Sequence, residues 1–121
     1  MEIERVVQDG VVIALVVSEQ PVITDVQSAV DVIATAGYEL DTNRIVIGRD
    51  SIDAGFYELP TGLAGEILQK FINYDTKLAI YGDFDVYDSN ALAEFIRESN
   101  EGNQIFFVAT RDEALVRLAR A

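Results

Sequence analysis

Three aspartates and a serine are the side chains of this sequence best placed for metal or acid–base chemistry. Asp83 and Asp85 follow the apolar run Lys77 to Tyr81, and Ser89 comes shortly after them. Asp50 follows a similar run earlier in the chain. Oxygen atoms that follow neighbouring parallel strands can converge on one molecule, because such strands end at the same edge of a sheet. We therefore predict a candidate ligand pocket at Asp50, Asp83, Asp85 and Ser89.

The acidic segment that begins at Asp83 does not have the spacing of a metal or nucleophile motif. Aligned on a calcium loop, it has Asp88 where the sharp turn requires glycine and Tyr87 where a carboxylate is required. A strand followed by Asp-x-Asp resembles phosphoryl-transfer enzymes of the haloacid dehalogenase type, but Tyr87 stands where these enzymes have serine or threonine. A turn whose acids complement the N-terminus of the next helix explains the segment. We assign no metal ligand and no cofactor to it.

The sequence contains neither histidine nor cysteine. This excludes zinc fingers, disulfides and the Ser-His-Asp and Cys-His catalytic pairings. General acid–base work would fall to carboxylates, lysine or tyrosine. We assign no catalytic residue and favour a role other than that of an enzyme.

Thr61 and Gly62 form a second candidate site. Thr61 follows Pro60 at the expected start of a helix. A phosphate on its hydroxyl would meet free backbone N–H groups and the positive end of the helix dipole. The sequence thus allows phosphorylation or partner binding at Thr61 and Gly62, or a hydroxyl that makes only a local hydrogen bond.

Charge limits the partners of this chain. With 9 basic and 21 acidic side chains, its net charge is −12, so nucleic acid and anionic membranes would be repelled. The longest apolar run, Val11 to Val17, is far below the roughly twenty residues that cross a bilayer. The first five residues are mixed in charge and do not resemble a secretory signal. We expect a cytoplasmic protein.

Apolar runs and turn signals predict five strands and four helices. Ile3 to Val7 and Val11 to Val17 are β-branched runs joined by Asp9-Gly10, the strongest short-range signal of a tight hairpin. Later apolar runs alternate with helical patterns and cover residues 44–48, 77–81 and 104–108. The expected fold is α/β, with a mixed five-stranded sheet that opens with a β-hairpin and the order ββαβαβαβα.

Capping residues set the expected helix ends. Thr24 with Gln27 is typical of a capping box at the start of the first helix, which Gly37 would end. Pro60 suits the first turn of the second helix, and Thr110 can cap the last one. Since no linker or repeat interrupts this pattern, residues 1–121 are expected to form a single domain. Any site should lie at the carboxyl ends of its parallel strands.

The segments ELPTGLAGEILQKFINYDTKLAIYGDF, from Glu58 to Phe84, and FIRESNEGNQIFFV resemble a bacterial family known as domain of unknown function family 4180. This resemblance spans nearly the whole chain. It implies no activity, because the family has none assigned.

The predicted element order is also similar to that of STAS domains, the anti-sigma factor antagonist type. Those domains open a helix with Asp-Ser-Ser/Thr-Gly-Leu, and Pro60-Thr61-Gly62-Leu63 occupies the corresponding place here. The resemblance implies that Thr61 matches the family's phosphorylated hydroxyl. Leu59 and Pro60 replace the aspartate and the first serine, and the preceding loop is longer.

Two functions follow as expectations. The first is a non-enzymatic regulatory or protein-binding module that is switched by phosphorylation at Thr61. The second is a small-ligand or metal-binding domain, catalytic or not, that uses the strand ends. A protein partner or self-association is expected, since the first strand of the hairpin can pair edge to edge with a second copy.

Overall fold

The computed structural model describes all residues from Met1 to Ala121. Its strands are β1 (Glu2–Gln8), β2 (Val11–Val17), β3 (Arg44–Gly48), β4 (Lys77–Tyr81) and β5 (Ile105–Val108). Its helices are α1 (Val26–Leu40), α2 (Leu63–Asn73), α3 (Asn90–Glu101) and α4 (Arg111–Arg120). The predicted order ββαβαβαβα is confirmed.

One mixed sheet of five strands runs through the molecule in the order β1-β2-β3-β4-β5. β1 is antiparallel to β2, and the other neighbours are parallel. The hairpin closes at Asp9 and Gly10, whose φ angles are 51° and 79°, as a two-residue turn with positive φ at both positions requires. The α/β class and the opening hairpin are therefore confirmed.

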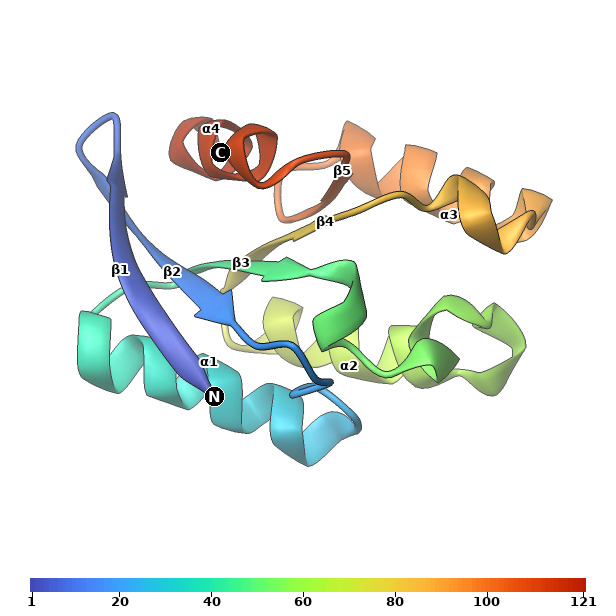
Figure 1. Ribbon diagram of the computed structural model, residues 1–121, viewed down its shortest axis with the longest axis horizontal. Coiled ribbons are helices and arrows are strands. Elements are labelled where there is room, and N and C mark those ends of the chain that lie inside the picture. The colour runs from blue at the N-terminus through green and yellow to red at the C-terminus, as the bar shows by residue number, and fades with distance from the viewer.

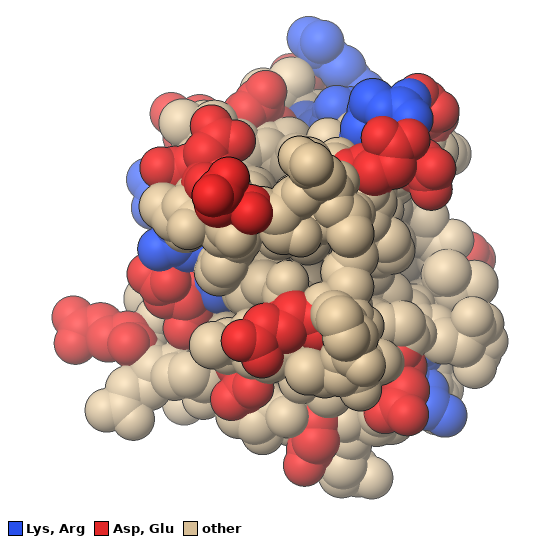
Figure 2. All heavy atoms as spheres, turned by 90° about the vertical axis from the view of Figure 1, so that its right-hand side faces the viewer, with Lys and Arg blue, Asp and Glu red and all other residues tan.

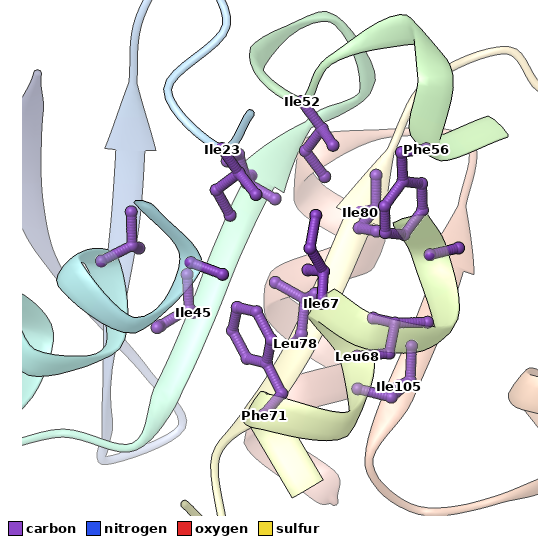
Figure 3. Close-up of a cluster of buried hydrophobic side chains, with 14 of the residues drawn as sticks. Ile23, Ile45, Ile52, Phe56, Ile67, Leu68, Phe71, Leu78, Ile80 and Ile105 are labelled. Carbon is purple, nitrogen blue, oxygen red and sulfur yellow. The ribbon is translucent and has the colours of Figure 1, made fainter. Parts of the chain in front are cut away.

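The helices cover the two faces of the sheet unequally (Figure 1). Side chains of β3 alternate, so Ile45 and Ile47 join the core beneath α1 and α2, whereas Val46 packs under α4. Figure 3 shows the larger core, where Phe71 and Ile67 of α2 meet Leu78 and other strand residues. α3 contributes Leu92 to this same core, so only α4 lies on the opposite face.

The predictions for both ends of α1 were wrong. The N-cap is Asp25, not Thr24, and Asp25 forms its capping box with Ser28 rather than Gln27. Gly37 does not end the helix, which continues to Leu40. Because an exposed glycine inside a helix costs only about 1 kcal/mol, packing on the sheet overrides it.

The second helix also begins later than predicted. Leu59–Thr61 forms a 3-10 turn around Pro60, and Gly62 then adopts a φ of 78° before α2 begins at Leu63. A residue with positive φ cannot continue either helix, so it separates the two. Thr110 caps α4 as predicted.

None of these helices combines the length and the apolar character needed to cross a membrane.

Candidate functional site

The parallel strands β2, β3, β4 and β5 all end at one edge of the sheet, which we call the carboxyl edge. After β4 the chain turns to α3 on one face, and after β5 it turns to α4 on the other face. Two adjacent connections that leave a sheet on opposite sides open a crevice between them. The topology therefore predicts a hollow between β4 and β5 at this edge.

A groove of about 920 Å³ lies in this place, and we call it the β4–β5 groove. Both connections and the exposed side of α3 line it. Its residues are 82–85, 88–90, Ala93, Ile96, Arg97, Asn100, 107–109 and Glu113.

The groove has an apolar floor and an acidic rim. Phe107 is buried, and the rings of Phe84 and Phe107 meet edge to face with centroids 5.4 Å apart. The exposed rim carries four carboxylates and one guanidinium, that of Arg97. Arg97 is already paired with Glu94, and with Glu101 at 2.8 Å. Figure 2 shows this side of the molecule, where acidic side chains outnumber basic ones. The rim carboxylates belong to Asp83, Asp85, Asp88 and Glu113.

A second, smaller hollow of about 380 Å³ lies beside the groove, over the ends of β3 and β4. Arg49 and Tyr81 are its largest side chains, and Asp83 also lines the groove. A Cβ at Gly48 would lie 3.3 Å from the Tyr81 hydroxyl, and one at Gly82 would lie 2.7 Å from the Arg49 Cβ. A side chain at Gly82 would therefore overlap Arg49, whereas one at Gly48 would require the Tyr81 ring to move by a few tenths of an ångström.

Arg49 is held in one position. Its Nε donates to Asp50 at 3.0 Å, and its Nη1 donates to the Asp83 carbonyl. The hydrogen bond to Asp50 raises the pKa of Arg49. Its guanidinium also lies over the Tyr87 ring, 5.7 Å from the centroid. Such contacts on several sides fix the direction of a guanidinium and leave little rotamer freedom.

Tyr57 contacts both Tyr87 and the backbone of Arg49 and so helps to hold Arg49 in place. Its ring stacks on Tyr87 with centroids 4.8 Å apart, and its hydroxyl donates to the Arg49 carbonyl at 2.7 Å. Burial raises the pKa of Tyr57 above its usual range. The phenol therefore remains a neutral hydrogen-bond donor.

The residues of the predicted ligand pocket all lie at the carboxyl edge, but they do not line one common hollow. Asp83, Asp85 and Ser89 line the groove, whereas Asp50 lines the second hollow. Asp83 accepts the Asp85 backbone N–H at 3.0 Å, and Ser89 accepts the Leu92 N–H at 3.2 Å. No group of three or more carboxylates lies close enough to hold a metal ion. These side chains shape the turn and cap α3.

Thr61 lines neither hollow. Its hydroxyl lies 2.9 Å from the Gly55 carbonyl and 2.8 Å from the Glu58 carbonyl, and it accepts the Leu63 N–H at 3.2 Å. Gly62 donates its own N–H to the Leu59 carbonyl at 3.0 Å. The hydroxyl thus makes the local hydrogen bonds that were one of the two interpretations of this position.

Sequence reasoning missed Asn100, Ile96 and Glu113 as groove residues. The Asn100 side chain points back to β5, where it bonds the backbone of Phe107. The spacing of Ile96 and Asn100 along one helix face was a signal that could have found them. Glu113 follows the cap Thr110 by three residues, and its carboxylate accepts the Ala109 N–H at 3.0 Å.

One protein family matches the chain. The family described as Domain of unknown function (DUF4180) matches residues 8–118. No curated protein and no solved structure matches.

Proposed function

We propose that this chain, which belongs to the DUF4180 family, is a non-enzymatic binding module that takes a positively charged segment of a partner protein in the β4–β5 groove. One observation carries the proposal, the hollow between connections that leave the sheet on opposite faces. Ligands of open α/β sheets bind in such crevices. The sequence prediction of a site at the strand ends supports the same place.

Charge selects the occupant. Four exposed carboxylates surround the groove, and the one guanidinium beside them is engaged by Glu94 and Glu101. The whole chain carries −12, so its field attracts cations from beyond the rim as well. Lysine and arginine side chains of a partner are the matching groups, and nucleic acid is a poor one.

The floor of the groove selects for a side chain with an apolar stem. Phe84, Ile96 and Phe107 supply carbon atoms below the acidic rim. Lysine and arginine lay their methylene groups along apolar surface and keep the charged end in water. A segment in which basic and apolar residues mix would therefore contact both the floor and the rim.

NMR titration of the ¹⁵N-labelled chain tests this role. The probe is a short peptide of lysine and leucine, and its partner control has glutamate in place of lysine. We expect the lysine peptide to shift amides of residues 82–90, 96–100 and 107–113, and the glutamate peptide to shift none. Binding should weaken as salt rises, because the rim charges are exposed.

Charge-removing variants give the matched control. Asp85→Asn with Asp88→Asn should weaken binding of the lysine peptide by roughly two- to thirtyfold, at about 0.2–1 kcal/mol for each of the two exposed charge pairs. Glu39→Gln removes a charge from the exposed last turn of α1, which lies where the parallel strands begin, and should leave the affinity unchanged. Equal losses in both variants, or shifts spread over the whole surface, would contradict the groove as the binding site.

A small polar ligand in the second hollow is the alternative function that the geometry supports. Gly48 and Gly82 keep this space open, and Arg49 presents a fixed guanidinium to it. Thermal-shift screening with divalent cations and nucleotides tests the alternative. A ligand at a hundred times its dissociation constant adds about 2.7 kcal/mol to the free energy of unfolding. If no compound raises the melting temperature, the alternative is wrong.

A further inference from the structure

We infer that two copies of this chain pair through β1 to form one continuous sheet around a twofold axis at Val6. This inference does not depend on the proposed function, because the β4–β5 groove lies at the other side of the sheet, beside β5. It rests on which sheet edge is open, on which backbone groups point outward, and on which register avoids like charges.

The two edges of the sheet differ. At β5, the Asn100 side chain bonds both polar backbone groups of Phe107, and the Glu113 carboxylate accepts the Ala109 N–H. α3 packs beside this strand as well. β1 lies at the opposite margin of the sheet (Figure 1), and no side chain of the molecule bonds to its outer groups. A long strand with unpaired N–H and C=O groups is a template for another strand.

The hairpin register identifies those outer groups. Gln8 and Val11 flank the two-residue turn and form the closing pair, so the hydrogen-bonded pairs alternate from there along β1. Ile3, Arg5 and Val7 consequently direct their N–H and C=O groups away from β2. Val7 is also 51 % exposed, so its side chain does not block the approach of a second strand.

Charge decides between the antiparallel registers that use these groups. A twofold axis at Arg5 would place two arginines face to face, and one at Glu4 would do the same with two glutamates. With the axis at Val6, Arg5 lies opposite the second copy's Val7, and Glu4 lies opposite its Gln8. An axis at Ile3 or Val7 would pair only three residues of the strand. Of the longer registers, only the one with its axis at Val6 places no like charges directly opposite, an arrangement that is destabilising across strands.

Packing favours the same axis. Val6 is half-buried against the core under α4, where it is paired with Ile13 of β2. Its counterpart in the second copy would extend this apolar row across the axis. The pairing adds backbone hydrogen bonds between Arg5 and Val7 of each copy and contacts between the two Val6 side chains. It is an isologous contact, which closes at two copies and leads to no filament.

Sedimentation across a concentration series tests the pairing on the intact chain. We expect a mass of twice 13.3 kDa at high concentration. Salt should strengthen the dimer, because two copies of net charge −12 repel each other while the contact itself holds no ion pair. A chain that remains monomeric up to about 1 mM, or a dimer that salt weakens, would overturn the inference.

A proline variant addresses the backbone directly. Val7→Pro removes an outward N–H and leaves the ladder to β2 intact, since proline is tolerated at an edge strand when its missing N–H faces solvent. We expect the dimer dissociation constant to rise by about tenfold or more. Val7→Thr keeps the N–H and the branched side chain, and should leave the constant unchanged. Equal dimerisation by the proline variant would overturn the inference.

Amide exchange in the unmodified chain provides a test that does not depend on how the variant folds. The N–H groups of Arg5 and Val7 should be protected at high concentration and exchange rapidly on dilution. The N–H of Val6, which bonds to β2, should remain protected at both concentrations. Rapid exchange of Arg5 and Val7 in a sample shown to be dimeric would place the interface elsewhere and overturn the inference.

Discussion

The Asn100 side chain takes the place of a neighbouring strand beside Phe107. Its Oδ1 accepts the Phe107 N–H at 2.8 Å, and its Nδ2 donates to the Phe107 carbonyl at 3.0 Å. An amide side chain has an acceptor oxygen and a donor NH2 group, so it can satisfy both backbone groups that β5 directs outward at this residue. The backbone carbonyl of Asn100 in turn accepts Arg117 Nη2 at 2.6 Å, which ties α3 to α4.

Asn100→Ala should lower the free energy of unfolding by about 1–3 kcal/mol, because it leaves a partly buried N–H and C=O without partners. Asn103→Ala, at an exposed position of the following turn, should change it by less than about 0.5 kcal/mol. Urea unfolding measures both. Equal effects from the two variants would show that the Phe107 contacts contribute nothing.

Gly82→Ala should destabilise the chain by about 1–3 kcal/mol. Gly82 has a φ of 154°, and an added Cβ would lie 2.7 Å from the Arg49 Cβ. The control is Gly65→Ala on α2, where no atom lies within 4 Å of the new Cβ. Alanine should stabilise that helix by about 0.5–1 kcal/mol. Urea unfolding should therefore give opposite signs, and a neutral Gly82→Ala would mean that the strand ends can separate.

The buried phenol of Tyr57 predicts a loss of stability in alkaline solution. Burial raises the pKa of Tyr57, whereas an unfolded tyrosine ionises near pH 10. Its contribution is complete below about pH 10, and the free energy of unfolding then falls by about 1.4 kcal/mol per pH unit as pH rises further.

Tyr57→Phe tests this source of the alkaline loss. The variant should be about 1 kcal/mol less stable at neutral pH, because the Arg49 carbonyl loses its donor, and its stability should fall less steeply above pH 10. Tyr38→Phe, at a side chain that is 93 % exposed, should follow the unmodified chain throughout. Parallel curves for the Tyr57 variant and the unmodified chain would contradict the assignment.

The sheet was predictable because its signals are local and redundant. Asp9-Gly10 has one favoured turn geometry, and apolar runs such as residues 77–81 are too short for any element but a strand. Helix ends were less predictable. Both Thr24 and Asp25 are good caps, and the choice depends on which one can bond Ser28 when α1 lies on the sheet.

The sequence predicted the edge of the sheet at which the candidate site lies, but not the shape of that site. The sequence placed Asp50, Asp83 and Asp85 at strand ends, and they lie there. It held no signal that α4 would take the opposite face from α3, and that choice opens the groove. The role of Asn100 could not be predicted either. Its partners are the N–H and C=O of Phe107, which lack a neighbouring strand because β5 is an outer strand of the sheet.

Thr61 provides a prediction about local structure. Thr61→Val removes the hydroxyl that bonds the carbonyls of Gly55 and Glu58 and accepts the Leu63 N–H, so it should cost about 1–2 kcal/mol in urea unfolding. Thr61→Ser keeps the hydroxyl and should stay within about 0.5 kcal/mol of the unmodified chain. A serine variant as unstable as the valine variant would assign the effect to the lost methyl group instead.

Phosphorylation of Thr61 should loosen the turns that precede α2. A phosphorylated hydroxyl oxygen can no longer donate to the Gly55 or Glu58 carbonyl, and the phosphate adds about −1.5 to −2 charges close to Glu58. Hydrogen exchange of the phosphorylated chain should be faster at residues 54–63 and unchanged in α4, which packs on the other face of the sheet. Phosphopeptide mass spectrometry of the native protein establishes whether the modification occurs. Unchanged exchange in a phosphorylated chain, or a Thr61 that is never modified, would contradict a switch at this residue.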